Sequence, residues 1–319
     1  MVINVSKRQL SYQDISLVPK KCIVDSRKKI NTEVKFGNHK FVMPVCASNM
    51  KSVVDIETCK FFAKHGWFYI MHRFDINYGL FISQMKKQNY FTSISIGISW
   101  GSKNVLEGLL IDNNIPDYIT IDVANAWSVE TQKMVQFIKE KFPDTFLIVG
   151  NVATGEAVEE IETWGVGALK CGLAAGKVCI TKNKTGVSRP MVSTILDCVG
   201  ASKEVSIIAD GGVVEHGDIA KALACGASMV MAGSLFAGYE QSAGNIIEIE
   251  DNMYKEYYGS ASKYNKQEYK NIEGKKILIK FKGDMERLLG ELKEDLQSSI
   301  SYIGGNVLSD LNGSDYYIL

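Results

Sequence analysis

Short apolar runs rich in β-branched residues alternate with longer segments of helical spacing from about residue 40 onward, and this alternation constrains the fold more than any other feature. It is the pattern of consecutive βα units. We predict eight strands, at Phe41–Ser48, Trp67–His72, Thr92–Ile98, Tyr118–Ala124, Phe146–Val152, Ala168–Leu173, Val205–Asp210 and Ser228–Gly233. Eight such units favour a closed parallel barrel over an open doubly wound sheet. The predicted fold is therefore an α/β protein, a (β/α)8 TIM barrel.

Signals for helix ends support this interpretation. They are Ser128 before and Pro143 after one helix, Thr154 before and Gly165 after a second, and Gly226 after a third. No linker, charge block or low-complexity tract divides the chain, so we expect a single domain over residues 1–319. It would carry an N-terminal extension and a polar C-terminal helical appendage. In such a barrel, the active site lies on the loops that follow the strands.

Composition excludes several classes of protein. Hydrophobic residues make up 46% of the chain and charged residues 23%, and no apolar run is long enough to span a bilayer. The first residues lack the basic start and apolar run of a secretory signal, so we expect a cytoplasmic protein without a membrane partner. Lys plus Arg and Asp plus Glu both total 36, which gives no reason to expect a nucleic-acid partner. The seven cysteines form no CxxC pair, which argues against disulfides and structural zinc.

One cysteine lies in a setting that suits chemistry. The loop after the sixth predicted strand reads GLAAGKVCITKNKTG from Gly172 to Gly186, with Cys179 near its centre. Its small residues allow close approach of a ligand, and its lysines, Lys177, Lys182 and Lys184, would stabilise a thiolate. Residue type alone also allows a buried, unreactive cysteine in a basic loop.

Glycine turns follow the last two predicted strands. Asp210-Gly211-Gly212 ends the seventh strand, and Gly233-Ser234 ends the eighth. Each turn alone could be a plain connection between a strand and a helix. Together, at neighbouring positions of a barrel, they favour a phosphate site built from backbone N–H groups, with Asp210 as an acceptor for ribose hydroxyls.

These motifs resemble those of the IMP dehydrogenase/GMP reductase family. The matching runs are GKVCITKNKTG at 176–186, ADGG at 209–212, MAGS at 231–234, YGSAS at 258–262 and EGK at 273–275, and the similarity extends from Tyr12 to Gly305. Three features favour the reductase branch over the dehydrogenase branch. MHRF at 71–74 runs directly into a helix without room for a regulatory insertion, the interval from Ser262 to Glu273 is short, and KTG at 184–186 follows the cysteine loop.

The resemblance implies a reaction and a set of site residues. The reaction is the NADPH-dependent reductive deamination of GMP to IMP and ammonia, a step of purine nucleotide interconversion, through a thioimidate on a cysteine. The implied catalytic residues are Cys179, Thr181 and Glu273. The implied substrate-binding residues are Asp210, Gly211, Gly212, Gly233, Ser234, Gly259, Ser260 and Lys270. The implied cofactor-binding residues are Asn49, Arg73, Asp122 and Asn125. It further implies a monovalent cation, K+, at the carbonyls of Ala174, Gly176 and Cys179, and a homotetramer.

Without the resemblance, plainer roles stay open for several of these residues. Glu273 could be an exposed carboxylate, Thr181 a hydroxyl bonded to its own loop, and the cofactor-binding group a set of caps and turn residues. The chain also departs from the family pattern at residues 172–176, 124–127 and 187–190, where Trp127 and Arg189 stand. Two other functions therefore stay open: a dehydrogenase of the same family without its insertion, and a catalytically silent nucleotide-binding barrel.

Overall fold

The computed structural model describes residues 8–267 and 270–319, and its centre is a seven-stranded parallel sheet in the order β4, β10, β9, β8, β7, β6 and β5. The strands are β4 (Val45–Ala47), β5 (Ser93–Ile96), β6 (Tyr118–Asp122), β7 (Phe146–Val152), β8 (Ala168–Cys171), β9 (Ser206–Asp210) and β10 (Met229–Ala232). Each lies within one of the predicted ranges. Seven of the eight predicted strands are therefore confirmed.

The remaining predicted strand, Trp67–His72, is wrong as a regular strand. Met71 forms a single parallel bridge to Ile94 of β5, and no ladder joins this segment to β4 in the described residues. A side chain supplies part of the missing pairing, because Ser95 Oγ donates to the Met71 carbonyl at 2.6 Å. The residues from Trp67 to Met71 are all buried, so the segment still fills the eighth position of the barrel. The predicted TIM barrel is thus confirmed with one irregular strand.

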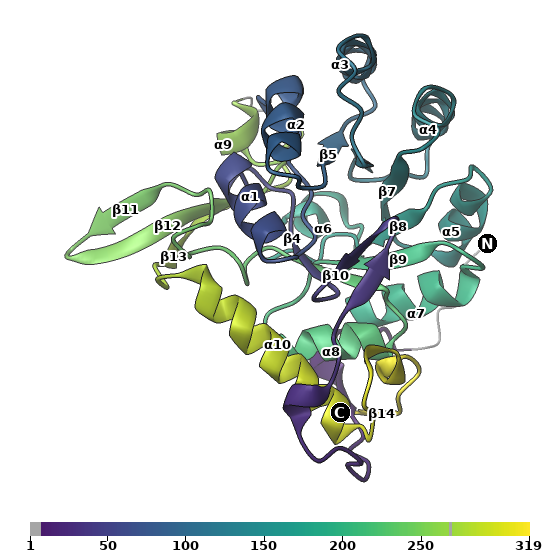
Figure 1. Ribbon diagram of the computed structural model, residues 1–319, viewed down its shortest axis with the longest axis vertical. Coiled ribbons are helices and arrows are strands. Elements are labelled where there is room, and N and C mark those ends of the chain that lie inside the picture. Colours follow the sequence, from purple (N-terminus) through teal and green to yellow (C-terminus); the bar gives the residue numbers. More distant parts are fainter. Residues whose placement is uncertain (1–7, 268–269) are drawn as a thin grey trace.

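Helices surround the sheet (Figure 1). The principal ones are α1 (Ile56–Lys64), α2 (Tyr78–Lys87), α3 (Trp100–Ile111), α4 (Val129–Lys141), α5 (Gly155–Glu162), α7 (Met191–Ala201), α8 (His216–Ala224) and α10 (Met285–Tyr302). The predicted starts are confirmed, since the side chains of Ser128 and Thr154 cap α4 and α5 by accepting N–H groups of the first turn. Gly165 and Gly226 follow α5 and α8 at φ +78° and +98°, a conformation that favours glycine.

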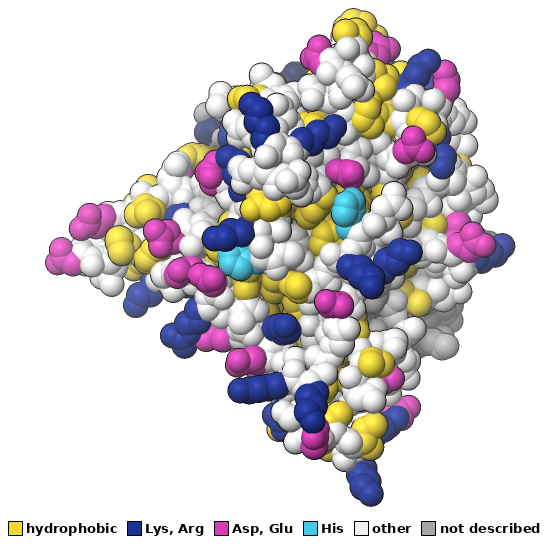
Figure 2. Space-filling view, viewed as in Figure 1, with side chains coloured by type: hydrophobic (Ala, Val, Ile, Leu, Met, Phe, Trp, Pro, Cys, Tyr) yellow, Lys and Arg dark blue, Asp and Glu magenta, His cyan; other side chains and the backbone are white. Residues whose placement is uncertain are grey.

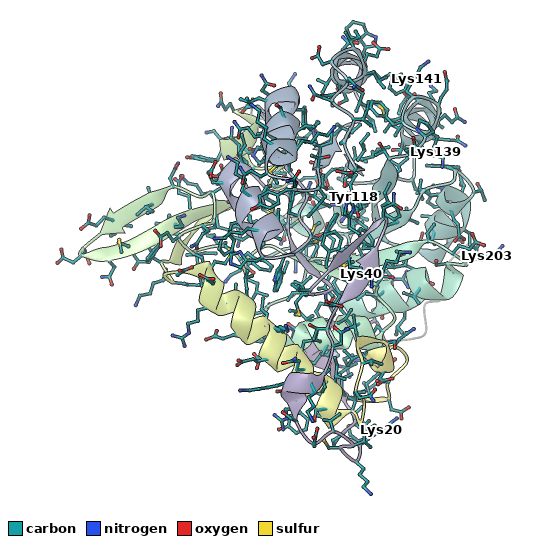
Figure 3. The ribbon with its side chains drawn as sticks, viewed as in Figure 1. Lys20, Lys40, Tyr118, Lys139, Lys141 and Lys203 are labelled. Atoms are coloured by element: carbon teal, nitrogen blue, oxygen red, sulfur yellow. The ribbon has the colours of Figure 1, made fainter. Side chains whose placement is uncertain are left out.

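Aromatic side chains close the amino-terminal end of the barrel. The hairpin of β2 (Val34–Phe36) and β3 (His39–Phe41) lies against Tyr118, the first residue of β6, which Figure 3 labels at the centre of the molecule. The Tyr118 hydroxyl donates to the Phe36 carbonyl at 2.7 Å, and it lies 2.9 Å from His39 Nδ1. This end is therefore packed with protein, and a ligand must use the opposite end.

The chain after β10 differs from the predicted helical appendage. β11 (Ile246–Ile249), β12 (Asn252–Tyr258) and β13 (Lys276–Lys280) form an antiparallel sheet that projects from the barrel (Figure 1). The hairpin between β11 and β12 turns at Glu250 and Asp251, both at positive φ, and without a glycine it gives a weak turn signal. The predicted helical character holds mainly for α10, which packs against α8.

The terminal segments pair with each other. β1 (Ile15–Leu17) and β14 (Tyr316–Ile318) form a two-stranded antiparallel sheet, which joins the predicted N-terminal extension to the last part of the chain. The shorter helices are η1 (Tyr12–Asp14), η2 (Arg27–Lys29), α6 (Thr181–Thr185), α9 (Lys263–Lys266) and η3 (Leu308–Leu311). Of these, α6 begins two residues after Cys179 and belongs to the cysteine loop.

Charged side chains of both signs are mixed over the face that Figure 2 shows. This matches the equal totals of 36 acidic and 36 basic residues. None of the helices in the described part of the chain combines the length and apolar character that crossing a bilayer requires.

His72, at the end of the irregular strand, should make the stability of the protein depend on pH. Burial, with a smaller contribution from Lys51, lowers the pKa of His72 to about 4 from the ordinary 6.5. Its Nδ1 accepts the Phe74 N–H at 3.2 Å, which requires an unprotonated nitrogen. As the pH falls, the unfolded chain binds a proton before the folded chain does. We therefore expect the free energy of unfolding to be about 2 kcal/mol lower at about pH 5 than at about pH 7.

Urea denaturation of the wild type and of His72→Asn at both pH values measures this effect. The asparagine oxygen can accept the same N–H without titrating, so the variant should lose most of the difference. A variant that keeps the full pH dependence would show that another group causes it.

Candidate active site

A cavity of about 460 Å³ lies at the carboxyl ends of the barrel strands. Its volume is typical of small-molecule sites. The loops after β4, β6, β8, β9 and β10 line it, together with Arg73, Asn151 of β7 and residues at the two ends of the β12–β13 connection (residues 259–275). The cavity is therefore where a barrel of this kind is expected to bind its ligand.

Cys179, Thr181 and Glu273 form a continuous hydrogen-bonded chain in this cavity. The Cys179 thiol donates to Thr181 Oγ1 over 3.2 Å, and that hydroxyl donates to Glu273 Oε2 over 2.6 Å. All three residues line the cavity, and Cys179 is only half-buried. Along such a chain the thiol proton can pass to the carboxylate, which leaves a nucleophilic thiolate.

Backbone pairing brings Glu273 to the cysteine loop from 92 residues away along the chain. The Ile180 N–H donates to the Glu273 carbonyl at 2.8 Å, and Gly274 forms an antiparallel bridge with Cys179. A Cβ at Gly274 would lie 2.8 Å from the Ser262 nitrogen, closer than real Cβ atoms come to backbone. The position of the carboxylate thus depends on main-chain contacts of the β12–β13 connection.

The glycine turns after β9 and β10 bring backbone close to the cavity. Gly211 and Gly212 have φ values of +101° and +76°, which favour glycine. A Cβ at Gly233 would lie 2.4 Å from the Tyr257 hydroxyl oxygen. These three glycines and Ser234 line the cavity. At each of the three glycines a Cβ would meet protein atoms, so glycine lets the main chain of both turns pack closely at the cavity wall.

The cysteine loop lies directly against the end of β9. A Cβ at Gly172, whose φ is +146°, would stand 2.1 Å from the Asp210 carbonyl oxygen. Asn151 Nδ2 donates to the Gly172 carbonyl and to Asp210 Oδ2, each at 2.9 Å. The loop and the Asp210 carboxylate therefore hold one another in place.

A buried charged cluster at the cavity is a feature that the sequence patterns above do not predict. Lys170, in the middle of β8, is almost fully buried, and its Nζ contacts Asp122 Oδ1 at 2.9 Å and Asp210 Oδ2 at 3.1 Å. Arg73 Nε lies 3.7 Å from Asp122 Oδ2. Burial works against charge on these groups, yet the opposite charges outweigh it: they raise the pKa of Lys170 and lower that of Asp122. The sequence signal for this cluster was a lysine within an apolar strand, because a buried lysine usually has a charged partner.

Most of the predicted site residues line the cavity. They are Asn49, Arg73, Asp122, Ala174, Gly176, Cys179, Thr181, Asp210, Gly211, Gly212, Gly233, Ser234, Gly259, Ser260 and Glu273. Asn125 and Lys270 are exposed and do not line it. Asn125 instead accepts the Trp127 N–H at 3.2 Å, as a turn residue does. The Trp127 indole N–H donates to Glu160 of α5 at 2.6 Å, and this ring does not line the cavity either.

Arg189, where the sequence departs from the family pattern, contacts its neighbours in the fold. Its guanidinium donates to the Ala153 carbonyl at 2.9 Å and pairs with Asp197. The Asp197 carboxylate also accepts the Gly155 N–H, at the start of α5, at 2.9 Å. Pro190 is the N-cap residue of α7. This departure therefore links α5 and α7, outside the cavity.

Fold and cavity together define an α/β-barrel protein that carries a cysteine loop at the carboxyl ends of its strands. The chain belongs to the IMP dehydrogenase/GMP reductase family, whose domain matches residues 9–318. It is 57% identical over 305 residues to the GMP reductase of Chromobacterium violaceum, with 96% of each chain covered. To the GMP reductase of Streptococcus gordonii it is 49% identical over 311 residues, 97% of this chain and 94% of the relative. To that of an Acidovorax species, strain JS42, it is 46% identical over 310 residues, 97% and 95% of the two chains.

Gly172→Ala tests the close approach between the cysteine loop and Asp210. The added Cβ clashes with the Asp210 carbonyl, so the loop must shift, and we expect the free energy of unfolding to fall by roughly 3 kcal/mol. Gly186→Ala is the matched control, because Gly186 also has positive φ but nothing lies within 4 Å of its Cβ position. Gly186→Ala should lower the free energy of unfolding by only about 1 kcal/mol. Equal losses in urea denaturation would mean that backbone conformation, rather than the contact with Asp210, sets the need for glycine.

Proposed function

We propose that this protein catalyses the reduction of GMP to IMP and ammonia with NADPH as the hydride donor. The observation that carries the proposal is the chain of hydrogen bonds from the Cys179 thiol through Thr181 to Glu273, inside a ligand-sized cavity. Membership of the family supports a purine nucleotide as the substrate. The relatives at 46% to 57% identity are named GMP reductase, which favours the reductase reaction over the dehydrogenase reaction.

The nucleotide is proposed to lie across the mouth of the barrel. Backbone N–H groups at a glycine turn suit a phosphate, and a carboxylate suits a ribose diol because it accepts two hydrogen bonds. The residues assigned to the nucleotide are Gly211, Gly212, Gly233 and Ser234 for the phosphate, Asp210 for the ribose, and Gly259 and Ser260 for the guanine. This arrangement places the guanine between the glycine turns and Cys179.

In the first half of the reaction, the Cys179 sulfur forms a bond to C2 of GMP, and the bond from C2 to the amino nitrogen breaks. The thiol proton moves through Thr181 to Glu273 and returns to the departing nitrogen, which leaves as ammonia. The purine is then held as a thioimidate on Cys179. Covalent catalysis of this kind replaces one difficult displacement with two easier steps. The proton relay is needed because an amide anion is too poor a leaving group.

In the second half, NADPH would supply a hydride to C2 once bound. Asn49, Arg73 and Asp122 are proposed to hold the nicotinamide half, since a carboxamide offers both donors and an acceptor and these side chains provide complementary groups. Asp122 suits this role because Lys170 and Arg73 already fix its carboxylate. The bond from C2 to sulfur then breaks, IMP leaves, and a proton taken up from water passes through Glu273 and Thr181 to the Cys179 thiolate.

A K+ ion at the carbonyls of Ala174, Gly176 and Cys179 is a further part of the proposal. The Gly176 carbonyl accepts the Cys179 N–H at 3.0 Å, and its second lone pair leaves it able to bind a cation. Such an ion would hold the backbone of the cysteine loop, and no step of the reaction passes through it. The proposed homotetramer can be checked by light scattering.

Two assay mixtures test the reaction. GMP with NADPH should give loss of NADPH absorbance, while turnover only with IMP and NAD would identify a dehydrogenase. GMP binding without either reaction would identify a silent barrel.

Cys179→Ala should abolish turnover and keep GMP binding. The control Cys22→Ala removes an exposed cysteine outside the cavity and should leave the rate unchanged.

Glu273→Gln tests the proton relay. Glutamine keeps the shape of the side chain but cannot hold the thiol proton, so we expect kcat to fall by roughly 10²- to 10³-fold while the KM for GMP changes little. Glu248→Gln, at an exposed carboxylate on β11, is the control. Steady-state kinetics of the two variants decide the matter, and a kcat near the wild-type value for Glu273→Gln would remove this carboxylate from the mechanism.

A further inference from the structure

We propose that Lys170 is a positioning residue that fixes Asp210, on the nucleotide side, and Asp122, on the nicotinamide side, in one cluster. Neither substrate contact nor catalysis is assigned to the lysine itself. Its role is to hold the two carboxylates at a fixed separation, so that the nucleotide and the hydride donor meet over Cys179. This inference rests on the proposed function, because that function gives each carboxylate its ligand.

The donors of Lys170 are fully used by the protein. An ammonium group has three N–H donors. Nζ lies 2.9 Å from Asp122 Oδ1, 3.1 Å from Asp210 Oδ2 and 3.4 Å from Asn49 Oδ1. These acceptors come from β6, from β9 and from the loop after β4, so one side chain joins three parts of the barrel. A lysine with three protein acceptors orients them rather than a ligand.

The contacts also decide which oxygen of Asp210 meets the ligand. Lys170 and Asn151 both donate to Asp210 Oδ2. Among the described residues this leaves Oδ1 for the ribose. Asp122 is held at both oxygens, by Lys170 at Oδ1 and by Arg73 at Oδ2. Loss of the ammonium would therefore free the two carboxylates to rotate and would leave them to repel each other.

Charge and burial make this cluster sensitive to the lysine. The side chain of Lys170 is 2% exposed, and those of Asp122 and Asp210 are 18% and 17% exposed. Lys170 and Arg73 balance the two carboxylates, so the cluster is neutral. Burial of like charges without a counterion is strongly unfavourable. An apolar residue at this position would force one of the carboxylates to bind a proton or to move.

The neighbouring strand is shaped to admit this side chain. Gly150 of β7 pairs with Lys170, and a Cβ at Gly150 would lie 2.5 Å from the Lys170 Cβ. Lys255 gives a contrast elsewhere in the fold. It is also buried, but its Nζ donates to the backbone carbonyls of Glu240 and Ser242 and to no carboxylate of the cavity. Lys255→Met is therefore a matched control, which removes a buried ammonium without freeing a site residue.

The test measures binding directly, without turnover. Wild type, Lys170→Met, Lys170→Arg and Lys255→Met are titrated with GMP and with 2′-deoxy-GMP by calorimetry, and with NADPH by fluorescence. Lys170→Met should lose about tenfold or more of the preference for GMP over 2′-deoxy-GMP, the effect of one hydrogen bond to a charged group. NADPH binding should weaken in the same variant. Lys170→Arg should recover part of the preference for GMP and part of the NADPH affinity. Lys255→Met should keep the wild-type preference and NADPH affinity while it lowers the melting temperature.

Other outcomes would overturn the inference. If Lys170→Met is destabilised like Lys255→Met but keeps the wild-type preference and NADPH affinity, the lysine is only structural. Should Lys170→Met fail to fold, Asp122→Asn in the presence of the lysine gives a second measurement. In that variant a neutral amide replaces one charged anchor of the ammonium, so Lys170 fixes Asp210 less firmly and the preference for GMP should fall. An unchanged preference would refute the coupling. If the wild type binds GMP but does not reduce it, the proposed function fails while the binding comparison still decides the role of Lys170.

Discussion

The common direction of the barrel strands is the constraint on which the site depends. All seven strands of the sheet, which has β4 at one edge and β5 at the other, run parallel. Their carboxyl ends therefore meet at one end of the barrel. Residues as far apart in the chain as Asn49 and Glu273 line the same cavity as a result. The opposite end is filled by the aromatic packing around Tyr118. One end of the barrel therefore provides stability, and the other is left for a ligand.

The interior changes character between these two ends. Cys46, Ile148, Ile208 and Met231 belong to the buried apolar cluster that includes Tyr118. Towards the mouth, Lys170 enters the interior with its two carboxylate partners. Ion pairs in such a place add little net stability, because removing charges from water offsets their attraction. Their value lies in geometry, since they hold polar groups at defined positions beside a cavity.

The sequence allowed the barrel to be predicted because buried parallel strands are continuous apolar runs, which can be recognised one at a time. It did not reveal that the segment ending at Met71 pairs only once, since that depends on contacts with β5. The sheet of β11 to β13 was missed for a local reason, the turn at Glu250 and Asp251 without a glycine. Strand propensity is most useful when strong turn signals separate the strands.

The candidate site was predicted in a similar way. The cysteine loop and glycine turns have local signatures, and resemblance added Thr181 and Glu273, which the structure joins by hydrogen bonds. Asn125 and Lys270 came from the same resemblance, yet neither lines the cavity. For Asn125 the reason is a local turn, in which its side chain accepts the Trp127 N–H. The Lys170 cluster was missed, since its partners lie 48 and 40 residues away and only the closed barrel brings them together.

The pairing of Gly274 with Cys179 has a consequence for changes in chain length. Neighbouring residues of a paired, extended segment point to opposite sides, so a slip of one position exchanges the side that each residue presents. A single inserted residue that propagated into this pairing would set a neighbour, Ile272 or Gly274 according to the side of the insertion, in the place of Glu273. It would remove the only carboxylate that Thr181 contacts among the described residues. Insertions and deletions in the β12–β13 connection are therefore tolerated only where a loop takes up the extra length before this pairing begins.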